Sequence, residues 1–244
     1  MKKIIILSIL LCCGTMNAQE IKIPHLYLQE VKVVNMEIAK TTFPIFNSFV
    51  KKAMGVVVNQ RLSHMGESGR VYTISTHESE ADLYKYFELR NGVFENMNAI
   101  MKENRTQLIN NEAGPSIRSV WEMLPELSNT WAKEFKSEDF DFRKIEMFTI
   151  PFGKEKEYFE TEIKLNKMDA ELGNKHYYVI FRAAEGYPTN TYLEILLDKS
   201  LLDYYNHRDE RNAKRNLVFN TLSFKNRALI NSIRIDHLSL MKQE

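Results

Sequence analysis

Cysteine is almost missing from this chain of 244 residues, because its two cysteines, Cys12 and Cys13, both lie within the first nineteen positions. The chain after residue 19 therefore has no disulfide, no cysteine nucleophile and no thiolate metal site. Its stability must come from an apolar core. About 225 residues are enough for that, as one duplicated domain or two small ones.

Residues 1–19 have the organisation of a secretory signal. Two lysines precede an apolar segment, residues 4–13, which is too short to span a bilayer, and small and polar residues follow it. We expect cleavage after Ala18 or Gln19 and an exported product, periplasmic or secreted. A lipid anchor on Cys13 is the alternative, but the residue before it is not small, as a lipid-attachment site would require.

An excess of charge of one sign is also missing. Without the signal, 31 basic residues (33 − 2) face 32 acidic ones, a formal charge of −1. A nucleic-acid partner would require a basic surface, so none is expected. No second apolar run approaches the length of a membrane span, and none is predicted.

Recognisable catalytic motifs are absent as well. The sequence contains no nucleophile elbow, no phosphate loop and no paired-carboxylate signature. Glu160 and Glu162 are close in sequence but lie on different sides of a predicted helix, so they are not expected to form a pair. The six histidines lack the spacing of a metal site, and no metal is predicted.

What the sequence does contain is a repeat. Residues 115–118 read Pro-Ser-Ile-Arg, and residues 231–234 read Asn-Ser-Ile-Arg, an offset of 116 (232 − 116). Matching helix starts, Ser-x-x-Asp at Ser79 and Ser200, support an internal duplication. We expect three segments after the signal: a first repeat at 20–124, a linker at 125–140 and a second repeat at 141–244.

Each repeat has the same predicted order of elements, β-α-β-β-α-β, which gives a four-stranded ferredoxin-like sheet covered by helices on one face. Two such sheets can bury their bare faces against each other and close an α+β barrel with the helices outside. The strands are expected at 26–34, 56–64, 70–76, 116–123, 142–150, 175–182, 191–197 and 232–240, and the helices at 44–54, from 79 to 114, at 154–172 and from 200 to 227.

This order of elements, written twice over residues 25–240, resembles the dimeric α+β barrel superfamily. That superfamily includes antibiotic-biosynthesis-type monooxygenases, NIPSNAP-like proteins, stress-responsive barrel domains and haem-handling members. The resemblance implies an α+β fold of tandem ferredoxin-like repeats that form the barrel within one chain. It also implies a ligand or substrate inside the barrel or at its mouth, in a monomer with a pseudo-dimeric barrel or in a homodimer.

Two polar positions recur at the offset of 116. Glu30 and Glu146 lie on the first strands of the repeats, and Arg118 and Arg234 on the last. Because first and last strands are neighbours in a ferredoxin-like sheet, each arginine is expected opposite the glutamate of its own repeat. These residues form either cross-strand ion pairs or the polar floor of a ligand site.

Three histidines are the candidates for a haem ligand, in the order His77, His207 and His237, since haem requires an axial ligand. His77 lies between a strand and its helix. His237 stands 116 positions after Trp121, and both are expected on closing strands, either as fillers of the barrel interior or as ligand contacts.

The leading functional hypothesis is an exported barrel protein that binds a small apolar or aromatic molecule without a built-in cofactor. Two alternatives stay open. One is an enzyme of the same fold, either a cofactor-independent monooxygenase or a haem-handling protein. The other is a structural or interaction module whose barrel interior is filled.

Overall fold

A computed structural model describes residues 24–54, 60–128, 140–174 and 177–242. The predicted export signal lies outside these residues, as does most of the predicted linker, and both stay predictions. Among the described helices, none is long and apolar enough to cross a membrane.

Eight antiparallel strands form a closed barrel in the order β1-β3-β2-β8-β5-β7-β6-β4, with β4 pairing back to β1. Each half of the chain supplies a ferredoxin-like sheet, β4-β1-β3-β2 and β8-β5-β7-β6, and two junctions, β2–β8 and β4–β6, join them. The predicted fold is confirmed. The strands are β1 (His25–Lys32), β2 (Gln60–Gly66), β3 (Arg70–His77), β4 (Ile117–Met123), β5 (Phe142–Thr149), β6 (Tyr177–Glu185), β7 (Thr191–Asp198) and β8 (Asn231–Leu240).

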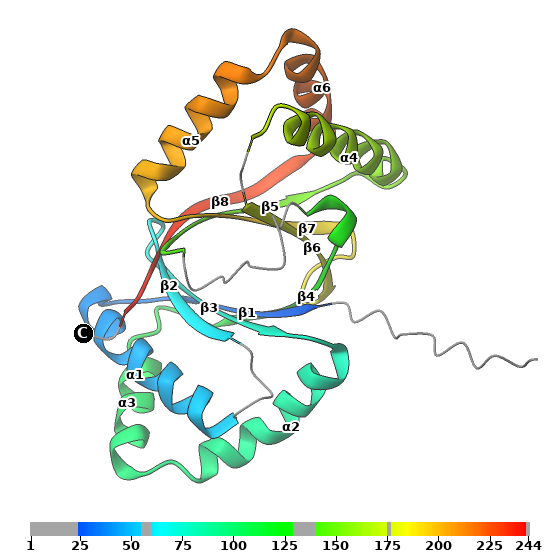
Figure 1. Cartoon of the computed structure of the whole chain (residues 1–244). Helices are drawn as coiled ribbons and strands as arrows, with labels where there is room; N and C mark the ends of the chain where they lie inside the picture. The colour runs from blue at the N-terminus through cyan, green and yellow to red at the C-terminus, as the bar shows by residue number, and fades with distance from the viewer. Residues whose placement is uncertain (1–23, 55–59, 129–139, 175–176, 243–244) are drawn as a thin grey trace, which may run out of the picture.

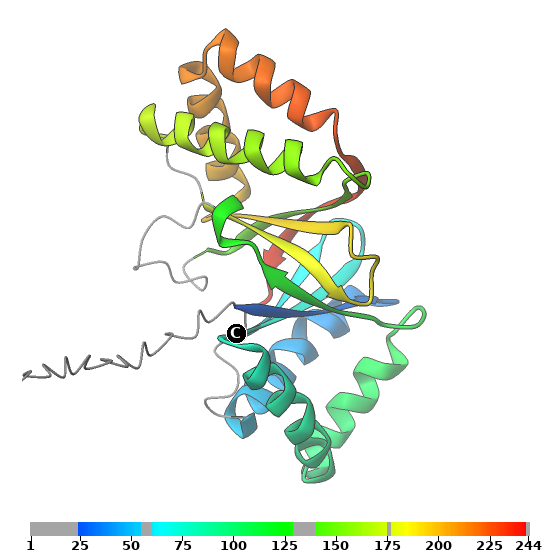
Figure 2. The same cartoon turned by 90° about the vertical axis from the view of Figure 1, so that its right-hand side faces the viewer.

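The helices form two layers on opposite sides of the barrel, α1–α3 below and α4–α6 above in Figure 1, and Figure 2 shows the same three-layer arrangement from the side. We call β1–β4 with α1–α3 the first half, and β5–β8 with α4–α6 the second half. The helices are α1 (Met36–Met54), α2 (Glu80–Glu95), α3 (Ala99–Asn110), α4 (Glu155–Glu171), α5 (Leu201–Lys214) and α6 (Leu217–Arg227), with a short 3₁₀ turn, η2 (Pro125–Leu127).

Side-chain caps explain where the helices begin. The predicted serine caps are present, since Ser79 and Ser200 accept hydrogen bonds from the backbone of the residue three positions later, at 3.2 and 3.0 Å. The helix expected from 79 to 114 is two helices, because Asn98 caps a new one, α3. The helix expected from 200 to 227 is likewise two, because Asn216 caps α6. The expected start of the first helix at residue 44 was wrong. The helix α1 begins eight residues earlier, at Met36, with Asn35 as its cap, and Pro44 lies inside it.

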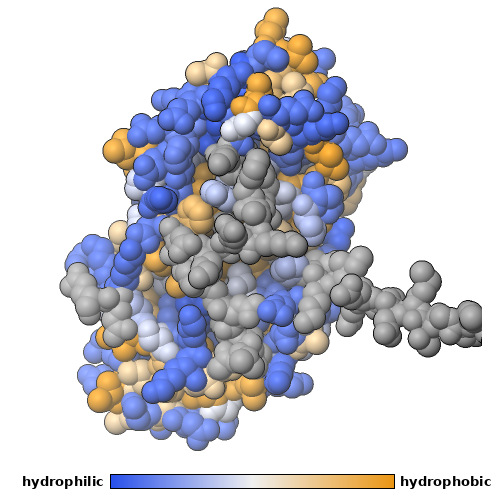
Figure 3. All heavy atoms as spheres, in the orientation of Figure 1, coloured by the Kyte–Doolittle hydropathy of each residue, from blue (hydrophilic) through white to orange (hydrophobic). Residues whose placement is uncertain are grey.

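Three apolar clusters hold the layers together. One fills the barrel interior and includes Trp121 and Leu238, both fully buried. The other two lie between each sheet and its own helices, around Tyr86 in the first half and Tyr158 in the second. The outer surface in Figure 3 is mostly hydrophilic, with scattered apolar side chains on the helices.

Strand register shows that the two halves repeat at an offset of 117 rather than 116. Leu26 lies opposite Trp121, and Arg143 lies opposite Leu238, so both pairs are related by 117 (143 − 26 and 238 − 121). Because side chains alternate between the faces of a strand, an error of one residue moves every side chain to the other face. The predicted equivalence of the recurring glutamates and arginines was therefore wrong.

Candidate functional site

The barrel interior contains a polar cluster in which acidic and basic groups are already paired. Arg234 on β8 lies 2.6 Å from the buried carboxylate of Glu30 on β1, and its guanidinium stacks over the ring of Tyr72 at 5.6 Å. The hydroxyl of Tyr72 donates to Asp236 at 2.8 Å, and that of Tyr187 donates to Glu30 at 3.3 Å. The interior is thus occupied by polar side chains that bind one another.

The two other members of the predicted polar floor lie outside the barrel. Arg118 is exposed on the outer face of β4, opposite Gln29, and so cannot face Glu30. Glu146 is buried on the outer face of β5, beneath the helices, and is paired with Arg227 of α6 instead of Arg234. Both expected pairings within a repeat were wrong, for the reason of register given above.

His77 and Trp121 are buried on opposite faces of their sheet. His77 lies under α2, where its Nε2 is 3.3 Å from the hydroxyl of Ser75 and its ring packs 5.1 Å from Tyr86. Trp121 is in the barrel interior and donates from Nε1 to the hydroxyl of Ser119 at 2.7 Å. Each side chain is held by packing and by a hydroxyl neighbour.

His207 and His237 each face a carboxylate at the surface. The Nδ1 of His207 on α5 is 3.0 Å from Asp198, beside a cavity of about 340 Å³. The Nδ1 of His237 on the outer face of β8 is 3.1 Å from Glu67. The predicted site residues are therefore dispersed over the molecule, and their role in ligand binding stays a prediction. Within the described ranges no group of three or more acidic, histidine or cysteine side chains could hold a metal ion.

A cavity of about 300 Å³ separates the helices of the second half from their sheet, and we call it the second-half cavity. One face of α4 and one face of α6 form its walls, because residues spaced by three, four or seven positions share a helix face. The outer faces of β5, β6 and β7 form its floor. The lining residues are Lys144, Tyr158, Glu162, Leu165, Asn166, Asp169, Tyr178, Glu194, Arg215, Phe219, Ser223, Asn226, Arg227 and Ile230.

Glu194, on the floor of this cavity, has a second glutamate beside it in the sheet. Glu146 of β5 and Glu194 of β7 are direct cross-strand partners, an arrangement that ordinarily destabilises a sheet. Arg227 and Lys144 offset it by pairing with Glu146, the lysine Nζ lying 3.4 Å away. Although burial acts in the other direction, the hydrogen bond from Arg227 and the charge of Lys144 hold the pKa of Glu146 below its usual range.

Glu194 and Glu162 line the same cavity, and in the described part of the chain neither is in an ion pair. Burial raises the pKa of Glu194, the charges of Lys144 and Arg227 oppose this shift, and the charge of Glu146 adds to it. Burial, followed by the charge of Glu194, raises the pKa of Glu162 to about 7. A carboxyl group with a pKa near neutrality can both accept and donate a proton under physiological conditions.

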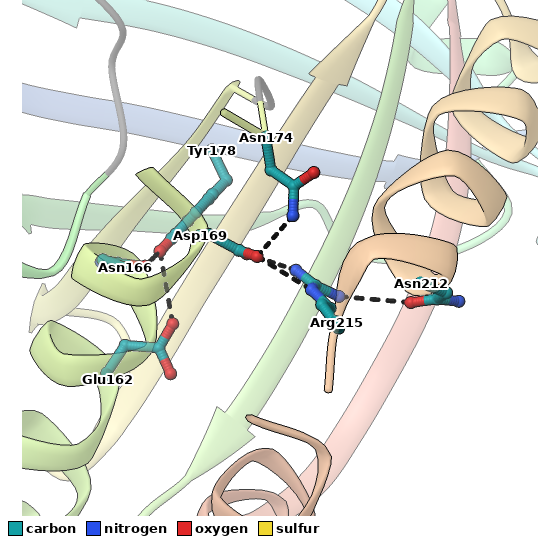
Figure 4. Close-up of polar contacts among 7 residues, drawn as sticks. All are labelled: Glu162, Asn166, Asp169, Asn174, Tyr178, Asn212 and Arg215. Carbon is teal, nitrogen blue, oxygen red and sulfur yellow. Dashed lines mark hydrogen bonds and ion pairs between the residues drawn. The ribbon is translucent and has the colours of Figure 1, made fainter. Parts of the chain in front are cut away.

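Two neutral hydrogen-bond donors orient the Glu162 carboxyl group, and Figure 4 shows one of them, Tyr178. The hydroxyl of Tyr178 lies 3.3 Å from its Oε1 and also contacts Asn166, and the amide of Asn226 donates to its Oε2 at 2.8 Å. These two donors favour the ionised form, yet burial outweighs them. The group is therefore fixed in position while it remains able to change its protonation state.

A buried ion pair closes one end of the cavity. Asp169 of α4 accepts a hydrogen bond from Nε of Arg215 at 2.9 Å and another from the amide of Asn174 at 2.8 Å. Arg215 in turn reaches Asn212 of α5 at 3.3 Å (Figure 4). The ion pair of Asp169 with Arg215 therefore connects α4 with the segment between α5 and α6.

Reasoning from the sequence missed this site because its members come from five helices and strands, α4, α6, β5, β6 and β7. The sequence pairs Glu162 only with its neighbour Glu160, whereas the charge that acts on it most, that of Glu194, comes from β7. One signal was available: Tyr158, Glu162, Leu165 and Asp169 recur at helical spacing, which places two acids on the apolar face of α4.

Comparisons with known proteins support the fold. No protein-family model and no curated sequence matches the chain. Among solved structures, a candidate monooxygenase from Fusobacterium nucleatum superposes with a TM-score of 0.59 and 13% identity, over 90% of this chain and 93% of that one. An anthrone oxidase-like protein gives 0.54 and 13%, over 91% and 92%. A haem-binding protein from Thermus thermophilus gives 0.51 and 7%, over 89% and 91%. At these identities the likeness establishes the dimeric α+β barrel fold alone.

Haem does not fit the second-half cavity. The second-half cavity is lined by no histidine, and burial raises the pKa values of Tyr158 and Tyr178, which opposes the phenolate that iron would need. The cavity beside His207 is lined by charged side chains and also by Phe140, Tyr177 and Leu197, so haem as a ligand of His207 stays a prediction.

Proposed function

We propose that this protein binds a small molecule with an ionisable hydroxyl group in the second-half cavity, and that Glu162 accepts the proton of that group. The observation that carries the proposal is a carboxyl group with a pKa of about 7 that lines a partly open cavity of about 300 Å³. A structural carboxylate would gain stability from a cation nearby, and the cations here pair with Glu146 and Asp169 instead.

The cavity can hold both parts of such a ligand. Tyr158, Leu165 and Phe219 offer apolar and aromatic surface to a ring. Lys144 of β5 and Arg227 of α6 line the same cavity as Glu162 and can stabilise the oxyanion that remains after the proton moves. The lining is more polar than the site expected for an apolar ligand, and the cavity lies outside the barrel rather than inside it.

The test compares 4-nitrophenol with 4-nitroanisole, which has the same ring but no hydroxyl proton. We expect nitrophenol to raise the melting temperature more than nitroanisole does. That preference should disappear in Glu162→Gln and persist in Glu171→Gln, which alters an exposed glutamate on the same helix. Equal stabilisation by the two compounds, or an unchanged preference in Glu162→Gln, would refute the proposal.

A cofactor-independent monooxygenase is the second candidate, because the same proton transfer would produce an electron-rich anion that can react with oxygen. The candidate monooxygenase and the anthrone oxidase-like protein share the fold, which is compatible with this chemistry. Oxygen uptake measured with phenols, lost in Glu162→Gln, would distinguish catalysis from binding.

A further inference from the structure

The first half has its own cavity of about 180 Å³ between helices and sheet, which we call the first-half cavity. Four arginines from four different elements converge on it: Arg61 from β2, Arg90 from α2, Arg105 from α3 and Arg118 from β4. The remaining lining residues are Gln29, Val31, Phe43, Phe46, Phe94, Leu108, Ile109, Glu112 and Ser116. A single carboxylate therefore faces four guanidinium groups.

Arg61 is buried beneath the helices, and neutral groups hold it in place. Its Nε donates to the amide oxygen of Asn47 at 3.1 Å, and its Nη1 donates to the hydroxyl of Tyr86 at 2.9 Å. Asn47 is itself fixed by a 2.7 Å bond to Ser63. These contacts position the guanidinium group but leave its charge uncompensated, which is costly away from water.

Arg90 and Arg105 hold Phe94 between them. Their guanidinium carbons lie 5.4 and 5.3 Å from the centre of its ring, so two helices direct positive charge to the same place. Arg118 approaches from the sheet, opposite Gln29. The four cations are thus arranged around one space by packing, although like charges repel.

Glu112 does not neutralise this cluster. In the described part of the chain, no ion pair joins a carboxylate to any of the four arginines. The lining carries a formal charge of +3, four arginines less one glutamate. Arginine donates two parallel hydrogen bonds to a carboxylate or a phosphate, and such groups would supply the missing negative charge.

We propose that the first-half cavity binds a small oxyanion, a carboxylate or phosphate group on a compact molecule. The volume of 180 Å³ limits the ligand to a few heavy atoms beyond that group, and Phe43, Phe46 and Leu108 provide a short apolar wall for them. The site is separate from the second-half cavity, so each of the two proposals can fail without the other.

The experiment measures the melting temperature of the full chain with sodium phosphate, sodium malonate and sodium chloride at equal ionic strength. Phosphate or malonate should stabilise the protein well beyond chloride. Tighter binding of phosphate identifies a phosphate-bearing ligand, and tighter binding of malonate identifies a carboxylate. Stabilisation no greater than that by chloride, from both anions, overturns the proposal.

Variants assign the effect to the cavity. Arg105→Gln and Arg118→Gln change exposed side chains, and each should weaken the affinity for the preferred anion by roughly tenfold or more, the loss expected for a hydrogen bond to a charged group. Lys102→Gln, on the exposed surface of the same helix as Arg105, should leave the affinity unchanged, and so should Glu162→Gln. Equal affinity in the two arginine variants and in the wild type would place the anion elsewhere and overturn the assignment.

Discussion

The two halves of the barrel share a strand order and a helical cover, but the spaces beneath their helices have different charges. The first-half cavity is lined by four arginines and one glutamate. The second-half cavity is lined by three cations and three acids, two of them glutamates with raised pKa values. In a duplicated fold, the apolar residues that join helix to sheet can be retained while the polar residues at the same depth diverge. The two cavities are then suited to different ligands.

The largest expected effect concerns the last strands of the two halves, β4 and β8. Their register places Arg118 on the outer face of β4 and Arg234 inside the barrel. Arg234→Ala would leave the Glu30 carboxylate buried without its cation, and we expect it to cost about 3–5 kcal/mol of unfolding free energy in urea titrations. Arg118→Ala, on the exposed face of β4, should cost less than about 0.5 kcal/mol. Equal losses would mean that the two arginines are equivalent after all.

The next effect is a dependence on pH that Glu162 of the second half should cause. The pKa of Glu162 is about 7 in the folded protein, against 4.5 as its ordinary value, so the folded state binds its proton more tightly. The stability contributed by this proton is complete below pH 4.5 and is lost as the pH rises towards 7 and above. Relative to Glu162→Gln, the wild type should lose on the order of 3 kcal/mol between pH 4.5 and pH 8. Parallel stability curves for the two proteins would show that the carboxyl group is not perturbed.

A smaller loss of stability is expected from Arg215, which is paired with a carboxylate, and a still smaller one from Arg105, which has no such partner among the described residues. Arg215→Ala removes the cation that Asp169 contacts, and we expect a loss of about 2 kcal/mol, limited by the bond that Asn174 still donates. Arg105→Ala should cost less than about 1 kcal/mol, since it gives up a contact with the Phe94 ring and no carboxylate partner. Chemical denaturation of the two variants measures both values. A greater loss for Arg105→Ala would reverse the comparison.

The smallest effect concerns the helical cover itself. Gly92 lies inside α2 at a position where an added Cβ atom would meet open space, whereas α4 contains no glycine. Gly92→Ala should raise the unfolding free energy by about 0.5–1 kcal/mol, because alanine loses less backbone entropy in a helix. Thermal unfolding checks this, and a destabilised variant would indicate a constraint on α2 beyond helix propensity.

The barrel could be predicted from the sequence because it depends on the order of elements, which the repeated Ser-Ile-Arg strands and the serine caps at Ser79 and Ser200 reveal. The site could not, because it depends on which face of a strand each residue occupies. The offset of 116 placed Glu146 inside the barrel with Glu30, and the true offset of 117 places it beneath α6. The interaction of Glu162 with Glu194 is harder to predict than the position of Glu146. No spacing in the sequence relates a residue of α4 to a residue of β7, two elements later.

The junction between β2 and β8 has a consequence for the order of folding. Hairpins such as β2–β3 and β6–β7 join neighbours in sequence, whereas Ser68 and Asp236 meet across 168 residues. Contacts between distant residues carry a high entropic cost of loop closure, so they form late. We expect each half to assemble its own sheet first, with the charges of Glu30, Arg234 and Asp236 still hydrated. Pulse-labelling hydrogen exchange should then show protection of the β8 amides that face β2 only after the hairpins are protected.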